Sequence, residues 1–161
     1  GCWCMLWRKT PTEFKEQKGN GNRESMRRLA HSERAPGILA YEGNKPIGWC
    51  AIAPREDYPA LSRSRVLKPI DDQPVWSVSC FFIDKAHRKK GLSARLLEAA
   101  VDYATSQGAK LVEGYPVEPV KDNYPAVYAW VGLAKTFKKA QFKECARRSP
   151  TRPIMRRKIK S

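Results

Sequence analysis

The hydrophobic positions of this chain change their spacing in the middle of the sequence, from a continuous apolar run to a helical repeat. Residues 75–83, Val-Trp-Ser-Val-Ser-Cys-Phe-Phe-Ile, are rich in β-branched and aromatic side chains and follow Pro74, which predicts a buried strand. From Leu92 to Ala104 the apolar residues recur at helical spacing, and Gly108 supplies a stop. The pattern therefore predicts a strand followed directly by an amphipathic helix.

The N-terminal half contains shorter elements separated by clear breakers. Alternating residues at 2–7 predict a first strand, on which Cys2 and Cys4 share one face. A turn sequence at 42–46, Glu-Gly-Asn-Lys-Pro, lies between two apolar runs and indicates a hairpin. The other elements predicted in this half are helices at 12–17 and 22–31, hairpin strands at 38–41 and 47–52, and a long connection at 54–74.

After the central helix the pattern returns to short strands. A strand at 110–114 is expected to run parallel to the strand at 75–83, because a helix crosses between them. A disordered basic tail over 147–161 is one interpretation of the C-terminus, and the apolar residues near its end favour packed strands instead. The remaining predicted elements are a short helix at 130–142 and antiparallel strands at 142–147 and 154–159.

These elements predict an α/β (mixed α+β) fold with the order β-α-α-β-β-β-α-β-α-β-β. We expect a central mixed, twisted sheet of about seven strands with helices on both faces. A length of 161 residues with 42% hydrophobic content fits one domain over residues 1–161. The chain begins with Gly1 rather than Met, so residues upstream can have been removed.

The formal net charge of +15 is unevenly distributed. Residues 134–161 carry 11 Lys and Arg against one acid, Glu144. Such a field attracts acidic partners. A polyanionic cofactor and a nucleic acid would both benefit, and a solvated basic surface without a specific partner is the third interpretation.

The cysteines and histidines do not indicate a metal site or a disulfide framework. Five cysteines occur without Cys-x-x-Cys spacing, and two histidines offer few further ligands. We therefore expect no metal and buried thiols. No apolar run approaches the length of a membrane span and the N-terminus lacks a signal-peptide pattern, which predicts a cytoplasmic protein without membrane contact.

The turn between the predicted strand and helix carries a concentrated positive charge. Arg88, Lys89 and Lys90 lie there, and Gly91 allows the backbone to approach a ligand closely. The first amides of a helix have no intrahelical acceptor, and the helix dipole places positive potential at this end. The turn is therefore expected to bind an anion such as phosphate.

This turn resembles motif A of the GNAT acetyltransferase superfamily, Arg/Gln-x-x-Gly-x-Gly/Ala, here Arg-Lys-Lys-Gly-Leu-Ser at 88–93. Residues 83–85 lie where that family often has Val-x-Pro, and Ser93 stands in place of Gly or Ala. The resemblance covers most of the chain and implies acetyl-CoA as the acyl donor, with its pantetheine arm between two splayed strands. The residues that it assigns to the cofactor are Phe82 and Ile83 for the arm and Arg88, Lys89, Lys90, Gly91, Leu92, Ser93 and Ala94 for the pyrophosphate.

A later motif of the same family bears on the catalytic acid. Residues 137–142 resemble the segment in which many members have a Tyr acid, and Phe137 stands at that place. Trp130 likewise replaces an Asn that is often present. Phenylalanine donates no proton, so another hydroxyl or water is expected to protonate the departing thiolate. The candidate hydroxyls are those of Tyr115, Tyr124 and Tyr128, of which Tyr128 is nearest along the chain.

Other polar residues near the predicted sheet offer further roles. Glu113 ends the strand at 110–114 and is the candidate general base, with a surface carboxylate paired to a Lys as the alternative interpretation. Cys80 is expected to be buried packing rather than a nucleophile. His87 is expected to assist anion binding or to be exposed.

Three functions follow from these observations. The leading prediction is an acetyl-CoA-dependent N-acetyltransferase that transfers the acetyl group directly to an amine. The alternatives are a basic nucleic-acid- or ribosome-binding module and a coenzyme A-binding protein without transferase activity. The acceptor depends on the loops at 54–74 and 115–129, whose sequences do not distinguish one amine from another.

Overall fold

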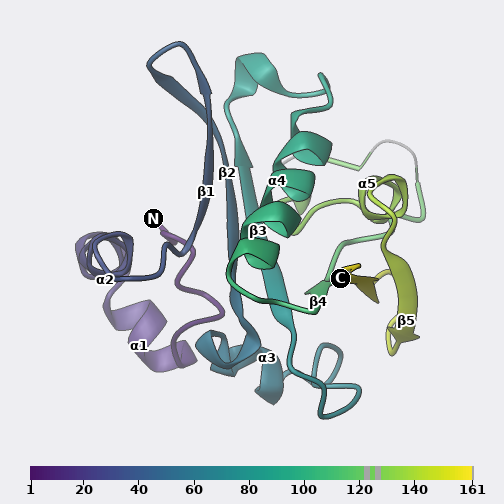
Figure 1. The fold of residues 1–161 in the computed structure, drawn as a ribbon. Helices are drawn as coiled ribbons and strands as arrows, with labels where there is room; N and C mark the ends of the chain where they lie inside the picture. The colour runs from purple at the N-terminus through teal and green to yellow at the C-terminus, as the bar shows by residue number, and fades with distance from the viewer. Residues whose placement is uncertain (122–123, 126–127, 161) are drawn as a thin grey trace.

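The structure, a computed structural model, describes residues 1–121, 124–125 and 128–160. These residues form one six-stranded mixed sheet in the order β1-β2-β3-β4-β6-β5 (Figure 1). Every neighbouring pair is antiparallel except β3 and β4, which are parallel. The strands are β1 (Gly37–Glu42), β2 (Lys45–Pro54), β3 (Trp76–Ile83), β4 (Leu111–Gly114), β5 (Lys143–Arg147) and β6 (Pro153–Lys158).

Helices cover both faces of this sheet. The largest is α4, whose buried residues pack with those of β2, β3 and α5 in one hydrophobic cluster. A second cluster joins α3 to Ala53 of β2 and Ile154 of β6. In Figure 1, α4 crosses in front of β2 and β3, whereas α1 and α2 lie beyond β1. The helices are α1 (Pro11–Glu16), α2 (Asn20–Ala30), η1 (Arg55–Asp57), α3 (Pro59–Arg63), η2 (Lys85–His87), α4 (Leu92–Ser106) and α5 (Ala134–Lys139).

The fold class and the central strand–helix unit agree with the sequence prediction. The predicted hairpin is β1–β2, the predicted parallel pair is β3–β4 with α4 crossing between them, and the C-terminal residues form the antiparallel pair β5–β6. The segment at 147–161 is therefore structured through Lys158. The predicted helix at 130–142 is shorter and begins at Ala134, since Gly132 has a φ of 87°.

The prediction of a first strand at residues 2–7 is wrong, and the described sheet has six strands rather than about seven. Trp3 and Cys4 have φ values of 49° and 56°, so the backbone turns where a strand would continue. The apolar residues of this segment pack on the sheet instead of pairing at its edge. Met5 is 1% exposed, and Cys4 Sγ lies 3.3 Å from Cys80 Sγ on β3.

The parallel pairing of β3 with β4 is short. It joins Trp76–Val78 to Val112–Gly114 and ends there, although β3 continues to Ile83. On its other side, the register between β2 and β3 shifts beside Ser79, which is left without a partner in the ladder. This shift is a β-bulge, a feature that re-aims side chains where two strands separate.

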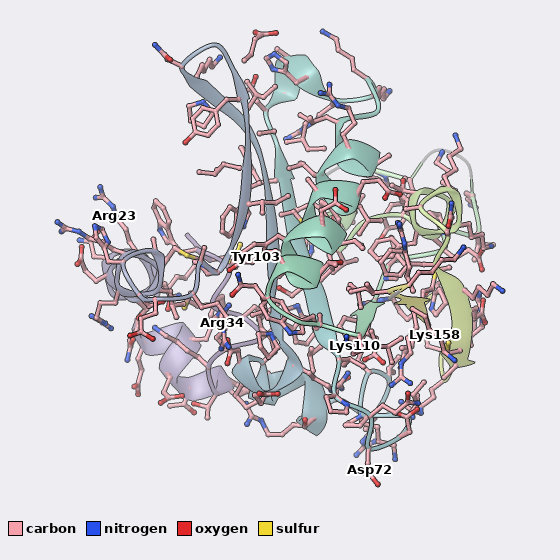
Figure 2. The ribbon with its side chains drawn as sticks, viewed as in Figure 1. Arg23, Arg34, Asp72, Tyr103, Lys110 and Lys158 are labelled. Carbon is pink, nitrogen blue, oxygen red and sulfur yellow. The ribbon has the colours of Figure 1, made fainter. Side chains whose placement is uncertain are left out.

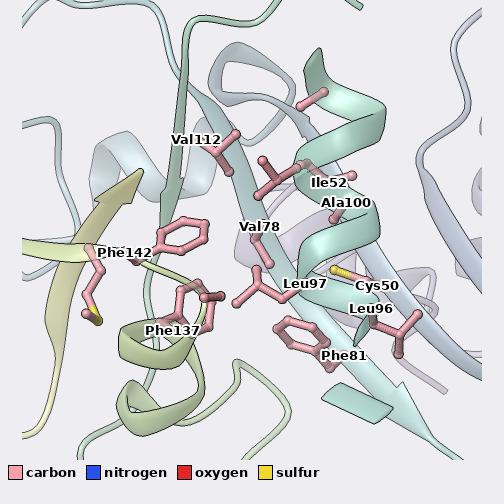
Figure 3. Close-up of a cluster of buried hydrophobic side chains, with 14 of the residues drawn as sticks. Cys50, Ile52, Val78, Phe81, Leu96, Leu97, Ala100, Val112, Phe137 and Phe142 are labelled. Atoms are coloured by element: carbon pink, nitrogen blue, oxygen red, sulfur yellow. The ribbon is translucent and has the colours of Figure 1, made fainter. Parts of the chain in front are cut away.

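A buried aromatic ring fills the space where the two strands separate. Phe137 of α5 is fully buried and packs against Phe81 and Phe142, at ring-centroid distances of 6.3 and 5.0 Å (Figure 3). A Cβ atom on Gly114 would lie 2.1 Å from a Phe137 ring carbon. Only glycine therefore allows the ring to sit against the end of β4.

We expect Gly114→Ala to lower the free energy of unfolding by about 1–3 kcal/mol, because the added methyl group overpacks against Phe137. Urea unfolding of the two proteins measures this change. The double variant Gly114→Ala/Phe137→Leu should recover part of the loss, because the smaller side chain makes room. A loss that is unchanged in the double variant would show that the ring does not impose the glycine.

Candidate functional site

Beyond Val78, β3 has no strand paired with it on the side where β4 ends, so that side of the strand is open. Phe81 N–H donates to the carbonyl oxygen of Trp130 at 2.6 Å, and the carbonyl of Ile83 accepts from Arg88 Nε at 3.0 Å. Backbone groups alternate in direction along a strand. The backbone groups of Phe81 and Ile83 therefore point away from β2, toward the open side, whereas those of Phe82 point toward β2. The cofactor contact of the Phe82 backbone stays a prediction, and Phe81 is a further candidate.

The chain following β4 is joined to β3 through a later segment. Trp130 accepts the hydrogen bond from Phe81, and Gly132 accepts one from Val117 N–H at 2.9 Å. The indole of Trp130 also packs against that of Trp7, with ring centroids 6.2 Å apart. Residues 130–133 thus lie between the two diverging chains, and any ligand that pairs with Phe81 must displace a carbonyl.

The turn between β3 and α4 adopts an unusual backbone conformation. Lys89 and Gly91 have φ values of 61° and 78°, in the left-handed region, and Gly91 is the residue immediately before α4. A Cβ on Gly91 would meet no described atom within 4 Å. The space above this glycine is therefore open to a ligand.

The turn is also anchored and positively charged. His87 Nδ1 lies 2.9 Å from Asp84 Oδ2, and His87 Nε2 lies 3.2 Å from Glu42 Oε2 on the β1–β2 hairpin. The His87 hydrogen bond lowers the pKa of Asp84. No described side chain caps the first turn of α4, and that turn contains no acid. With Arg88, Lys89 and Lys90 exposed around it, the turn fits a phosphate group.

Glu113 is completely buried and is paired with arginines rather than with a surface lysine. Its Oε1 accepts from Arg55 Nη1, and its Oε2 accepts from Arg156 Nε at 2.6 Å. Arg156 also reaches Asp71 with two bonds of 2.6 and 2.9 Å. These bonds lower the pKa of Asp71. The result is an alternating Arg–Glu–Arg–Asp chain in which both oxygens of the Glu113 carboxylate are paired.

Tyr115 extends this chain toward β3. Its hydroxyl donates to Glu113 Oε1 at 2.6 Å, accepts from Arg55 Nη1 at 2.6 Å, and lies 2.7 Å from Ser77 Oγ. Burial and the neighbouring Glu113 raise the pKa of Tyr115 well above its ordinary value. The phenol therefore stays neutral and retains its proton near neutral pH. The structure thus brings Glu113 and Tyr115 together.

The structure does not bring the third predicted catalytic residue to the same place. Tyr128 is 60% exposed and packs against Tyr124, with ring centroids 6.2 Å apart. It lies two residues before Trp130, whose carbonyl contacts β3. Tyr128 is therefore a surface residue beside the open edge, whereas Phe137 belongs to the core.

Ser79 is a candidate that sequence reasoning missed. It occupies the bulge at the point where β3 and β4 separate, and it is 2% exposed. Its buried hydroxyl lies near the Tyr58 hydroxyl but forms no hydrogen bond of ordinary geometry with a described residue. A buried hydroxyl without such a bond costs stability, which a functional role would explain. The only signal in the sequence was a pair of serines within an otherwise apolar run.

The basic C-terminal segment uses much of its charge inside the molecule. Arg148 donates to the carbonyls of Val66, Lys68 and Pro69, and Arg157 donates to Glu98. Arg147 contacts Glu118 and Glu144, while Arg152 donates to the Tyr115 carbonyl.

Within the described ranges, no group of His, Cys, Asp and Glu could hold a metal ion. No helix there is both long and apolar enough to cross a membrane.

Comparisons with known proteins agree with this architecture. A sequence model of the acetyltransferase (GNAT) family matches residues 3–130. An N-acetyltransferase from Staphylococcus aureus Mu50 shares 13% identity at a TM-score of 0.56, covering 88% of this chain and 77% of that one. A GNAT-family acetyltransferase from Streptococcus pneumoniae shares 17% at 0.52, covering 87% and 75%.

A structural match with lower sequence identity is a chain of the NatC complex bound to Gag peptide and CoA. It shares 9% identity at a TM-score of 0.55, covering 99% of this chain and 91% of that one. At such identities the structural likeness shows the fold alone. No curated protein sequence matches this chain.

We expect Glu113→Gln to lower the free energy of unfolding by about 3–5 kcal/mol, because it leaves two largely buried arginines without their carboxylate. The matched control is Glu118→Gln. Glu118 also contacts two cations, Lys138 and Arg147, but its side chain is 35% exposed. The control should cost about 1 kcal/mol or less. Urea unfolding measures both, and equal losses would contradict a special role for burial.

Proposed function

Because the chain belongs to the acetyltransferase (GNAT) family, we propose that it transfers an acetyl group from acetyl-CoA to an amine. The observation that carries this proposal is the turn before α4. There, a left-handed glycine, an uncapped first helical turn and three exposed basic residues converge on one open space. These are the features that a pyrophosphate requires.

The proposed cofactor contacts fall into two groups. The amides of Leu92, Ser93 and Ala94 and the charges of residues 88–90 would hold the pyrophosphate, with Gly91 allowing its close approach. The open edge of β3 would hold the pantetheine arm through the backbone of Phe81 and Ile83. The Phe81 N–H first has to release the Trp130 carbonyl, and the Ile83 carbonyl has to release Arg88 Nε or share itself with it.

The proposed chemistry lies where β3 and β4 separate. Bound acetyl-CoA supplies a thioester carbonyl that a neutral amine can attack. The Glu113 carboxylate is the proposed proton acceptor, and it acts through the Tyr115 hydroxyl, which contacts it at 2.6 Å. The bulge at Ser79 places a buried hydroxyl at the same point of the sheet. Tyr128, beside the open edge, is the proposed proton donor to the departing thiolate.

Acetyl-CoA is expected to raise the melting temperature by several degrees at saturation, because a ligand that binds only the native state stabilises it. Gly91→Glu should abolish this shift by placing bulk and negative charge in the phosphate space. Gly108→Glu is the matched control. Gly108 has a φ of 84°, has open space above it and follows the opposite end of α4.

The control should therefore suffer comparable backbone strain yet keep the acetyl-CoA shift. A shift that survives in Gly91→Glu would place the coenzyme elsewhere. The absence of any shift in the unsubstituted protein would refute the proposed cofactor. In that case, affinity for a nucleic acid that falls steeply with salt would support the alternative of a basic binding module.

Transfer itself is tested by release of the coenzyme thiol in the presence of small amines, lysine peptides and peptides with free N-termini. Tyr128→Phe should lower this rate about 10²-fold or more while leaving the acetyl-CoA shift intact, because only the proton donor is lost. Tyr124→Phe, which removes the neighbouring hydroxyl, should leave the rate unchanged. Binding without turnover on every amine would instead support a coenzyme-binding protein without transferase activity.

A further inference from the structure

A cavity of about 540 Å³ lies away from the proposed coenzyme turn, between α2, the segment around Met5 and the residues leading into β1. Its polar lining consists of Arg8, Lys9, Arg28 and Arg34, with Asp57 and the serines 25 and 32. Figure 2 shows Arg34, which follows α2, in the region between that helix and the sheet. Arg23, which belongs to α2, points outward. A volume of this size is typical of small-molecule sites.

The charges around this cavity do not balance. Four cations face a single carboxylate, which leaves three positive charges uncompensated by the lining. Asp57 serves two of the cations, with Oδ2 lying 3.0 Å from Arg34 Nη2 and 3.8 Å from Arg8 Nη1. Neither Lys9 nor Arg28 forms an ion pair with a described carboxylate; both have neutral partners.

Those neutral partners hold the two remaining cations at the cavity wall. Lys9 Nζ donates to Gln17, Asn22 and Ser25, at 2.6, 2.8 and 2.9 Å. Arg28 reaches the same Ser25 oxygen at 3.3 Å. Burial and the nearby Arg28 lower the pKa of Lys9, with Glu13 acting in the opposite direction. Lys9 is partly buried and Arg28 is exposed, so both charges are accessible to an anion that enters the cavity.

Arg8 is the most deeply placed of the four. Its side chain is 9% exposed, its guanidinium lies 4.5 Å above the Tyr58 ring, and it donates to the Tyr58 hydroxyl at 3.3 Å. The Tyr58 ring thus holds the guanidinium in place. A fixed guanidinium recognises planar and tetrahedral oxyanions with little loss of side-chain entropy.

We propose that this cavity binds a small molecule bearing a phosphate or diphosphate group. A single carboxylate would neutralise one of the three excess charges, whereas a phosphate monoester carries a charge of about −1.5 to −2 at neutral pH and a diphosphate more. Arginine and lysine donors on several sides match the several acceptor oxygens of such a group. This site is additional to the proposed acetyl-CoA site and does not depend on it.

The distance between the two sites follows from the fold. Tyr103 Oη donates to the carbonyl of Ala35, a residue of the cavity wall, at 3.0 Å. Tyr103 lies in the last turns of α4, whereas the coenzyme turn precedes Leu92 at the other end. At 1.5 Å per residue, these two positions are about 17 Å apart along the helix axis. One phosphate group cannot occupy both sites.

The test is calorimetric titration of the protein with inorganic phosphate and inorganic pyrophosphate, performed in the Gly91→Glu background so that the coenzyme turn is blocked. Arg28→Gln should weaken pyrophosphate binding about tenfold or more, because it removes a charged donor whose guanidinium contacts Ser25 in the fold. The matched control is Arg27→Gln, on the neighbouring position of α2. Arg27 is not among the residues that line the cavity, and it is paired with Glu24.

Pyrophosphate binding that Arg28→Gln weakens and Arg27→Gln leaves unchanged would support the site. Equal affinities in the two variants, or no binding in the Gly91→Glu background, would overturn it. Citrate, a tricarboxylate of similar charge, tests the chemical class, and tighter binding of citrate than of pyrophosphate would contradict the phosphate assignment. Circular dichroism and unfolding midpoints of both variants establish that neither loses its fold.

Discussion

The contact between Phe137 and the end of β4 is the constraint on which the arrangement of the site depends. Gly114 accepts the ring because it has no side chain, and the parallel pairing with β3 ends at that residue. Beyond it, β3 continues alone to Ile83 and reaches the turn before α4. The same ring therefore closes the core and forces two strands apart. A hydroxyl at position 137 would be buried in that core rather than directed at a substrate.

The second organising interaction is the buried charge chain centred on Glu113. Arg55 of η1 and Arg156 of β6 meet the carboxylate on β4, and Asp71, later in the connection that contains η1, joins the chain through Arg156. The long connection at 54–74 is therefore packed against the sheet. Its residues Tyr58, Leu61 and Leu67 are buried in the second hydrophobic cluster. Burial and the neighbouring Glu113 raise the pKa of Tyr115 and keep its phenol neutral, so it keeps the proton that the proposed relay passes to Glu113.

The strongly basic composition has a different meaning in the folded molecule than in the sequence. Many arginines of the C-terminal third bind carboxylates or backbone carbonyls of their own chain. At two places, the turn at residues 88–90 and the cavity beside α2, basic residues outnumber the acids beside them. Each is the location of a proposed anion site.

The sequence by itself determined the local elements and the basic, glycine-bearing turn between β3 and α4, because these depend on residue type and spacing within a short stretch. The apolar run at 75–83, the helical repeat after it and the glycine between them sufficed to predict β3, α4 and their connection. The hairpin and the C-terminal strand pair followed in the same way. The first segment was mispredicted because its alternating pattern is also satisfied by turns that pack on a sheet face.

Tertiary structure decided everything that depends on partners far apart in the chain. The environment of Glu113 required Arg55 and Arg156, 58 and 43 residues away, and no local pattern indicates such pairing. The direction of the Phe81 and Ile83 backbone followed from strand pairing, and the isolation of Ser79 followed from a register shift. The cavity beside α2 exists only where three segments meet. Short-range spacing is encoded residue by residue, whereas burial and charge compensation arise only when the chain has packed.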